Sequence, residues 1–479
     1  MVAAIIVLSN TEVYISTFSA LLGDVYMLSL TKGAPRKIRM GENPSRKGFP
    51  VILIIIMIIP LSLCLILAPL GLLGTPIQVV LNTVITMGFS ITFFFVSFSI
   101  PLAIRHAYRE SIAEFPEDYK PRVTILVPAH NEEKVIARSI ESLLKLEYEN
   151  KEIIVIDDGS VDKTYAIAAW YRQFGVKVLK RPNGGKARAL NLGLVYSTGE
   201  IVAVLDSDTV LYPDSLNHIV DVMSDPGVYA VGGNVKALNT RSVLERCQEL
   251  EYITSFNTLR RGLDLFGAIN VVPGAFGAFK KEAIMNSGMY DPDTVAEDFD
   301  LTIKVHKGYG SVRSSSDAIS LTEVPPTMKN LFRQRFRWVR GTFQVMLKHK
   351  DALTQPRFGV LHTIVFPLLL MSYIVPFATF SAIGAGIAMA LMGGLMNYLK
   401  IIVIFFLVQI LIAALALSLN NARHSLVLYS PLLVLGYRQY IDLISVYTTI
   451  HFIFSKKRMK AEWTKVDRVG GQAPIARTA

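Results

Sequence analysis

The stretch that decides the fold is Ile153-Ile154-Val155-Ile156-Asp157-Asp158-Gly159-Ser160, four β-branched apolar residues followed at once by two aspartates and a turn. The same pattern returns where the apolar run Ile201-Val202-Ala203-Val204-Leu205 ends in Asp206-Ser207-Asp208. Helical periods separate such strands, and residues 132–146 carry their apolar side chains on one helical face. The order β-α-β-α-β predicts a parallel sheet with helices on both faces. Polar residues that follow its strands gather at the carboxyl edge, where open α/β sheets bind ligands.

Apolar segments flank this α/β region on both sides. Hydrophobic residues make up 51% of the chain and charged residues 18%, a balance too apolar for an ordinary soluble protein. Much of the net charge of +11 comes from Lys and Arg beside the apolar spans. This is the positive-inside pattern of a multi-pass membrane protein with a cytoplasmic α/β domain, and we expect no nucleic-acid partner. Cys64 and Cys247 lie far apart and lack metal-ligand spacing, so a disulfide is not expected.

Changes in hydropathy and charge along the sequence divide the chain into five predicted parts. These are an N-terminal segment of uncertain structure with a basic cytoplasmic end (1–50), a transmembrane hairpin (51–104), the cytoplasmic domain with an interfacial helix near 328–348 (105–353), C-terminal transmembrane helices (354–455) and a basic cytoplasmic tail (456–479). The C-terminal apolar spans cover 360–395, 401–419 and 427–453. The first is too long for one crossing and is expected to form two helices, or one helix with an interfacial piece. Four crossings would keep the basic tail inside.

The aspartates at the strand ends have both a structural and a chemical interpretation. Asp206 and Asp208 flank a small residue, so both can face one divalent cation that offsets the charge of a nucleotide diphosphate. A turn or helix cap fits the same motif as well. Asp157 and Asp158 form an ordinary turn with Gly159, or accept hydrogen bonds from a base or ribose.

Two further motifs open predicted helices. Lys186 follows Gly184-Gly185 at a helix N-terminus, where it would meet phosphate oxygens, although a plain glycine turn fits equally and the spacing is not that of a P-loop. Glu297-Asp298 either complements a helix dipole or supplies a general base for a sugar hydroxyl.

One helical face and one loop complete the candidate residues. Gln334, Arg337 and Trp338 share a face, where the indole offers a platform to a sugar and Arg337 can fork onto a pyrophosphate. The helix 328–348 as a whole also fits a basic amphipathic helix at the membrane surface. Gly274 would let a substrate approach the backbone, while Phe276 is an aromatic contact or a core residue.

In this order the motifs resemble the processive family-2 glycosyltransferases, such as cellulose, chitin, hyaluronan and poly-N-acetylglucosamine synthases, over residues 120–350. The matching stretches are Val127-Pro128-Ala129-His130-Asn131-Glu132, Asp157-Asp158-Gly159-Ser160, Asp206-Ser207-Asp208, Glu297-Asp298 and Gln334-Arg335-Phe336-Arg337-Trp338. The similarity is greatest to the poly-N-acetylglucosamine and hyaluronan branch. The tail stretch 462–468 loosely resembles a gating loop of the family, the alternative being a disordered basic tail.

The resemblance implies a GT-A nucleotide-binding α/β domain embedded in an α-helical multi-pass cell-membrane protein, acting with Mg²⁺ or Mn²⁺ and inverting the anomeric carbon. It implies the base Asp298 beside Glu297, and a metal at Asp208 and Asp206. The implied donor contacts are Pro128, Glu132, Asp157, Asp158, Lys186, Asp206, Gln334 and Arg337. The expected acceptor contacts are Trp338, Gly274 and Phe276.

Three functions follow as hypotheses. The first is a synthase that takes a UDP-sugar, expected to be UDP-N-acetylglucosamine, and extends and translocates a β-linked polysaccharide. The second keeps the chemistry and transfers one sugar to a membrane lipid. The third is a transporter or receptor without catalysis, for which Arg438 and Asp442 are the obvious intramembrane charges.

Overall fold

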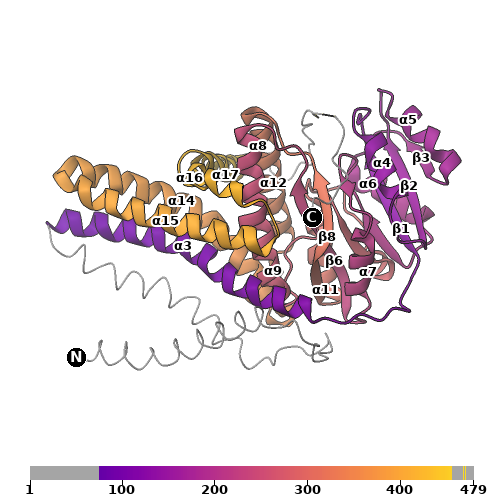
Figure 1. The fold of residues 1–479 in the computed structure, drawn as a ribbon, viewed down its shortest axis with the longest axis horizontal. Coiled ribbons are helices and arrows are strands. Elements are labelled where there is room, and N and C mark those ends of the chain that lie inside the picture. Colours follow the sequence, from indigo (N-terminus) through magenta and orange to yellow (C-terminus); the bar gives the residue numbers. More distant parts are fainter. Residues whose placement is uncertain (1–74, 456–467, 469, 471–479) are drawn as a thin grey trace.

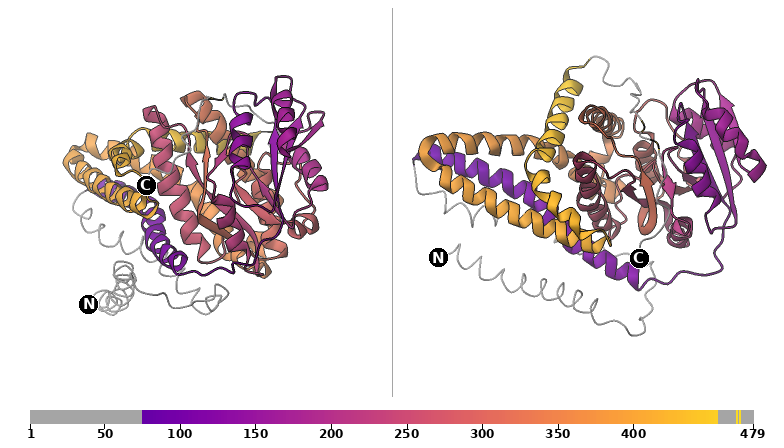
Figure 2. Two further views of the ribbon diagram at one scale, coloured as in Figure 1. Left: turned by 45° about the vertical axis from the view of Figure 1, so that its right-hand side comes forward. Right: turned by 45° about the horizontal axis from the view of Figure 1, so that its top comes forward.

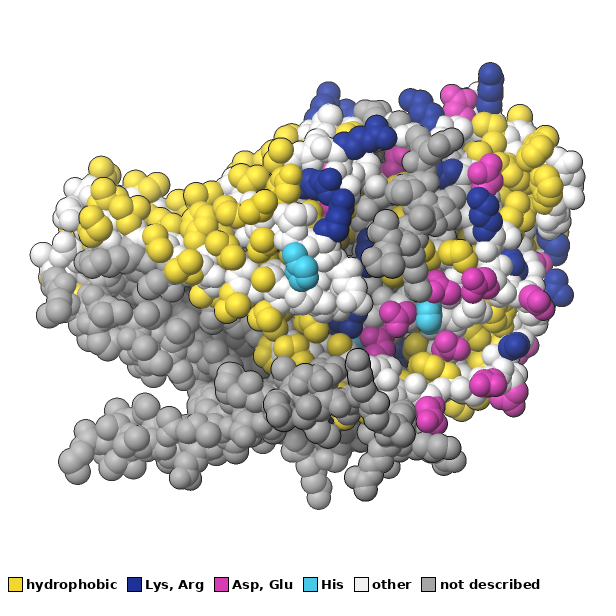
Figure 3. All heavy atoms as spheres, in the orientation of Figure 1, with side chains coloured by type: hydrophobic (Ala, Val, Ile, Leu, Met, Phe, Trp, Pro, Cys, Tyr) yellow, Lys and Arg dark blue, Asp and Glu magenta, His cyan; other side chains and the backbone are white. Residues whose placement is uncertain are grey.

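The computed structural model describes residues 75–455 together with 468 and 470. The predictions for 1–50 and for the first apolar span at 51–73 lie outside the described residues. A bundle of long helices extends from one side of an α/β domain (Figure 1). In the space-filling view, hydrophobic side chains cover the bundle, whereas charged side chains gather over the α/β domain (Figure 3).

The bundle contains α3 (Pro76–Ser111), α14 (Phe366–Met389) and α15 (Leu395–Leu419), which run side by side (Figures 1 and 2). The predicted span at 79–104 lies within α3. The predicted span at 360–395 is one continuous helix, Leu361–Gly394, in which α14 lies between the π-helical turns η4 (Leu361–Val365) and η5 (Ala390–Gly394). It is the one helix in the described part that is long and apolar enough to cross a membrane.

The last apolar span does not form the single helix expected over 427–453. It is divided into η6 (His424–Tyr429), α16 (Ser430–Val434) and α17 (Tyr437–Phe454). Pro431 lies in the first turn of α16, where proline is favoured. Gly436 follows the end of α16 with a φ of 105°, a conformation that favours glycine. After this break α17 crosses the end of the bundle at a steep angle and packs against the domain (Figure 2).

The α/β domain is built on one eight-stranded sheet of order β3-β2-β1-β4-β7-β6-β8-β5. Its elements in chain order are β1 (Val123–Ala129), α4 (Ile136–Leu144), β2 (Lys151–Asp158), α5 (Thr164–Trp170), η1 (Tyr171–Phe174), β3 (Lys177–Arg181), α6 (Lys186–Tyr196), β4 (Ile201–Val204), β5 (Val210–Leu211), α7 (Ser215–Met223), β6 (Val228–Ala237), α8 (Val243–Glu251), η2 (Tyr252–Asn257), α9 (Thr258–Asp264), β7 (Gly277–Lys280), α10 (Lys281–Asn286), α11 (Glu297–Gly308), β8 (Ser311–Thr322), α12 (Met328–Lys348), α13 (Asp351–Thr354) and η3 (Pro356–Phe358).

The predicted parallel unit is confirmed for β1 to β4, and the rest of the sheet is mixed because β7 pairs antiparallel with both β4 and β6. Alternate residues of β1 enter opposite cores, since Ile125 and Val127 belong to one apolar cluster and Leu126 to the other. Both faces of the strand are therefore covered, which explains its uninterrupted apolar sequence. The register Ala129↔Asp157 places the ends of β1 and β2 side by side.

Buried charges join α3 to the domain. The Asp264 carboxylate at the end of α9 accepts hydrogen bonds from Arg313 Nε at 3.0 Å and Nη2 at 2.7 Å, and lies 2.9 Å from His106 Nε2 of α3. Burial acts to raise the pKa of Asp264, but the charges of Arg313 and His106 outweigh it and hold this pKa well below its usual range. The long helix is thereby fixed to the sheet by paired charges as well as by apolar contact.

Candidate active site

Three charged side chains from distant parts of the sequence meet beyond the end of β4. Lys186 Nζ, at the first residue of α6, lies 2.7 Å from Asp206 Oδ1 and 2.9 Å from Glu297 Oε1 at the start of α11. Lys186 and Glu297 are nearly buried, whereas 35% of the Asp206 side chain remains exposed. The sequence predicted each residue separately, and the structure brings them into one charged cluster.

The turn before α6 places Lys186 in this cluster. The Asp158 carboxylate accepts N–H groups from Gly184 at 3.1 Å and Gly185 at 2.7 Å, and it pairs with Arg181. Gly185 has a φ of 90°, which a side chain would strain. Asp158 therefore shapes the turn that starts α6, and the expected contact with a donor base stays a prediction.

Asp298 is held next to Lys186 by the loop that contains Gly274. Its Oδ2 accepts the Gly274 N–H at 3.0 Å, and its Oδ1 accepts the Phe299 N–H at 2.8 Å. A Cβ added at Gly274 would lie only 2.6 Å from Lys186 Nζ. A side chain at this position would push the end of Lys186 aside, so glycine favours the close approach of the loop to the carboxylates, and the expected contact of Gly274 with an acceptor stays a prediction.

The two aspartates differ in their electrostatics. Burial and the neighbouring Glu297 raise the pKa of Asp298, against the opposing charge of Lys186. Burial also acts to raise the pKa of Asp206, but the charge and hydrogen bond of Lys186 outweigh it and lower this pKa. Asp206 therefore favours its ionised form, while Asp298 has the greater tendency to take up a proton, which would suit a general base.

Asp208 lies beside a cation contributed by the C-terminal tail. Arg468 forms an ion pair with Asp208 Oδ2 and donates to both carboxylate oxygens of Glu132 over 2.9–3.1 Å. Thr209 and Thr322 donate hydroxyls to Asp208 Oδ1 at 3.2 and 3.3 Å. The guanidinium stands where a divalent cation between these carboxylates would bind.

The oxygen ligands at this place suit a hard cation such as Mg²⁺ or Mn²⁺. Within the residues that the structure describes, no group of three or more His, Cys, Asp or Glu side chains gathers to hold a metal alone. Asp208 and Asp206 therefore fit a cation whose remaining ligands are water and phosphate oxygens, as is usual for Mg²⁺ at nucleotide sites.

The Trp338 platform on α12 rests on a buried ion pair. Arg335 lies under the indole, 4.2 Å from its centroid, and its Nη2 is 2.6 Å from Glu251 Oε2 of α8. Phe256 meets the same indole edge-on at 6.1 Å. The sequence assigned Arg335 no role of its own, and the structure makes it the support of Trp338.

Gln334 and Arg337 share the Trp338 side of α12, as predicted. Gln334 Oε1 is buried without a hydrogen-bond partner in the described part of the chain. The charges of Glu297, Asp206 and Asp298 act on Arg337, although burial dominates and lowers the pKa of this guanidinium. Arg337 thus lies near enough to the acidic cluster for the opposite charges to interact.

One predicted contact is wrong, and two others receive no support. Phe276 is fully buried in the core beneath the sheet, so it cannot touch an acceptor. Pro128 is buried within β1, and its expected contact with the donor stays a prediction. Asp157 is also fully buried, and neither carboxylate oxygen has a hydrogen-bond partner among the described residues. Periodicity could not separate these inward-facing residues from their outward-facing neighbours.

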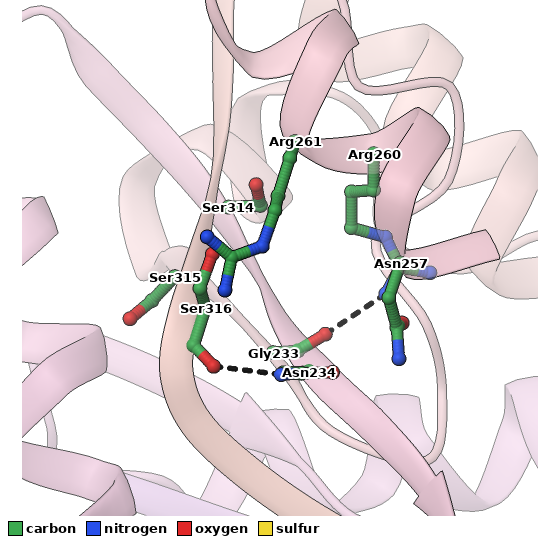
Figure 4. A pocket seen from close by; sticks show the side chains of 8 residues that line it. All are labelled: Gly233, Asn234, Asn257, Arg260, Arg261, Ser314, Ser315 and Ser316. Atoms are coloured by element: carbon green, nitrogen blue, oxygen red, sulfur yellow. Dashed lines mark hydrogen bonds between the residues drawn. The ribbon is translucent and has the colours of Figure 1, made fainter. Parts of the chain in front are cut away.

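A small polar pocket lies apart from the carboxylates, between β6, β8 and the η2–α9 segment (Figure 4). Arg260 Nη1 donates to the Gly233 carbonyl at 3.0 Å across it, and Asn234 Nδ2 donates to the Ser316 carbonyl at 2.7 Å. None of the acidic cluster lines this pocket, so we place the active site at the carboxyl edge of the sheet.

Comparison with known proteins indicates the family of the domain. Residues 124–288 match the family model described as Glycosyl transferase family 2. The chain is 32% identical over 255 residues to the poly-beta-1,6-N-acetyl-D-glucosamine synthase of Staphylococcus aureus (strain COL), over 52% of this chain and 60% of that protein. It is 35% identical over 230 residues to the protein of that name from Staphylococcus epidermidis, over 47% of this chain and 56% of that protein. The match thus spans less than two thirds of either relative.

A solved structure shares the fold. A mannosyltransferase from Pyrobaculum calidifontis, in complex with GDP-Man and Mn²⁺, superposes with a TM-score of 0.54 at 22% identity, over 78% of this chain and 99% of that one. The mixed sheet therefore has the GT-A type of fold. The chain carries a family-2 glycosyltransferase domain, as its motifs predicted.

Proposed function

We propose that this protein is a membrane-integrated, inverting, metal-dependent synthase that adds N-acetylglucosamine from UDP-N-acetylglucosamine to a growing β-linked polysaccharide and translocates the product. The observation that carries the proposal is the meeting of Lys186, Asp206, Glu297 and Asp298 at the carboxyl edge of a family-2 domain. The staphylococcal relatives are named as poly-beta-1,6-N-acetyl-D-glucosamine synthases, which supports this donor sugar. The apolar bundle supports membrane integration, with the catalytic domain in the cytoplasm.

The proposed reaction uses Asp298 as the base. The acceptor hydroxyl gives its proton to Asp298 as its oxygen forms a bond to the anomeric carbon, and the bond from that carbon to UDP breaks with its electron pair on the phosphate. Attack opposite to the leaving UDP inverts the centre and yields a β-linkage. The proton on Asp298 then passes to solvent, which restores the base.

Other residues bind and orient the substrates in this proposal. A divalent cation bound at Asp208 and Asp206 would offset the charge of the leaving diphosphate. Lys186 and Arg337 would contact the diphosphate oxygens, with Gln334 beside them, and Glu132 would contact the nucleotide. Trp338 would stack under the terminal acceptor sugar, since an indole face covers an apolar sugar face well.

The test uses the purified protein in detergent or nanodiscs with a panel of radiolabelled UDP-sugars and Mn²⁺ or Mg²⁺. We expect a high-mass product from UDP-N-acetylglucosamine that a β-hexosaminidase digests. Asp298→Asn should abolish synthesis, whereas Asp293→Asn, which changes a carboxylate that is 57% exposed in the preceding loop, should not. A solvent-extractable product with one sugar would instead assign a lipid acceptor, and no product longer than a disaccharide would refute a polymer synthase.

A further inference from the structure

A buried ion pair lies directly behind Asp208. Arg138 Nη2 of α4 is 2.7 Å from Oε1 of Glu323, the residue that follows β8. The two side chains are 14% and 4% exposed. Neither residue belongs to the motifs found in the sequence, and neither has a place in the reaction proposed above.

Both members of the pair are tied to Asp208. The same Arg138 Nη2 lies 3.4 Å from the Asp208 backbone oxygen. Thr322, the residue before Glu323, donates its hydroxyl to Asp208 Oδ1 at 3.3 Å. The Glu323 charge also acts on the Asp208 carboxylate. A movement of either member would therefore displace the carboxylate or change its field.

The pair is neutral as a unit, but its members would act on a bound cation with opposite signs. Arg138 alone would repel a divalent cation at Asp208, whereas Glu323 alone would attract one. The other charged groups around Asp208 are Asp206, Glu132 and Arg468. The tail meets the pair too, since the Gly470 N–H donates to Glu323 Oε1 at 3.0 Å.

We propose that Arg138 and Glu323 form a positioning pair that sets the affinity of Asp208 for its divalent cation. The pair fixes the Asp208 backbone and carboxylate, and Glu323 cancels the positive charge that Arg138 brings to the site. This inference rests on the proposed role of Asp208 in metal binding. It adds two residues that touch neither substrate nor metal to the determinants of that binding.

Mn²⁺ binding to the purified protein tests the pair without turnover. The electron paramagnetic resonance signal of free Mn²⁺ is followed during a titration at saturating UDP. Glu323→Gln removes the negative charge that offsets Arg138, so we expect affinity to fall about tenfold. In the double variant Arg138→Gln/Glu323→Gln the repelling charge is gone, and affinity should return to within about threefold of the wild type.

The recovery in the double variant is the readout that a merely structural role would not produce. If the pair only holds the fold together, the double variant should bind Mn²⁺ as weakly as Glu323→Gln or more weakly. Arg138→Gln alone should bind at least as tightly as the wild type, because Glu323 is then free to attract the cation. Should Arg138→Gln fail to fold, the changes in Mn²⁺ affinity of Glu323→Gln and of the double variant still distinguish a positioning pair from a merely structural one.

Two controls separate this inference from the proposed function. Asp208→Asn should lose Mn²⁺ binding, and a variant that retained it would refute the proposed metal site itself. Arg423→Gln removes an arginine that is 57% exposed and paired with Glu249, and it should bind as the wild type does. Loss of binding in Asp208→Asn together with unchanged binding in Glu323→Gln would overturn the positioning pair alone.

Discussion

Glu251→Gln should destabilise the platform under Trp338 more than any exposed charge substitution. Glu251 Oε2 accepts from Arg335 Nη2 at 2.6 Å and from the Tyr437 hydroxyl at 2.6 Å. The side chains of Arg335 and Glu251 are only 5% and 9% exposed. The substitution keeps the shape of the side chain and removes its charge, so that a buried guanidinium loses its counterion.

The size of the effect follows from this burial. Breaking a buried ion pair on one side costs about 3–5 kcal/mol, because the remaining charge is left uncompensated. Glutamine can still accept one hydrogen bond, so we expect a value near the lower end, about 3 kcal/mol. A loss of that size corresponds to a decrease in Tm of roughly 6–12 °C for a domain of this size.

Thermal unfolding in detergent, followed by tryptophan fluorescence, measures the decrease. The control is Glu249→Gln, two residues earlier on α8, whose carboxylate is 14% exposed and pairs with Arg423 and Arg246, which are 57% and 25% exposed. Because water reaches both arginines, these pairs should contribute about 0–1 kcal/mol, and the control should shift Tm by no more than roughly 4 °C. We also expect Glu251→Gln to raise the KM for the acceptor, since Trp338 loses its support. Equal Tm values for the two variants would refute the reasoning.

Three further predictions concern charge. Burial and Glu297 raise the pKa of Asp298, so kcat/KM should begin to fall with decreasing pH at values above the ordinary aspartate pKa. A profile that stays flat down to pH 4 would contradict the assignment of Asp298 as the base. Asp298→Asn should lower the rate at least about 100-fold. Arg468→Gln removes the guanidinium that pairs with Asp208 and Glu132, so a Mn²⁺ titration without nucleotide should show an affinity about fivefold higher than that of the wild type. Unchanged or weaker Mn²⁺ binding would exclude competition between the guanidinium and the cation. Burial acts to raise the pKa of Glu152, but hydrogen bonds from Lys177, Thr124 and Thr198 outweigh it and lower this pKa to about 2. The ionised Glu152 therefore stabilises the folded state above the unfolded pKa of about 4.3, and this stabilisation is lost as the pH falls toward 2. Glu152→Gln should therefore lose about 1–3 kcal/mol at pH 7, measured by denaturant unfolding, and show a weaker pH dependence, whereas wild-type stability at pH 7 would refute the role.

Local patterns were sufficient for the elements that carry the site. The β-branched run before Asp157 gave a buried strand, since such side chains pack well on a pleated surface. The spacing of Gln334, Arg337 and Trp338 placed them on one side of α12, whose bounds Met328–Lys348 match the predicted 328–348. Each of these inferences depends on neighbours within one or two turns, which the sequence displays directly.

Local patterns failed where neighbouring residues face different surroundings. Gly274 and Phe276 lie two residues apart in one loop, yet one borders Lys186 and the other is fully buried. The span 427–453 is mostly apolar, but Gly436 redirects it, so α17 lies against α12 instead of continuing along the bundle. Hydropathy reports how apolar a segment is and does not report its direction.

The sequence by itself determined the parallel β1–β4 unit, the strand-end aspartates and the family of the domain, because these follow from short-range periodicity and from motifs in a fixed order. Only the tertiary structure decided which charges meet. Lys186 joins Asp206 and Glu297, Arg335 joins Glu251, and the tail residue Arg468 reaches Asp208. Such pairs form where distant segments of the chain pack together and bury both charges, because a buried charge is stable only beside a partner of opposite sign. That condition depends on the path of the whole chain, which no local pattern encodes.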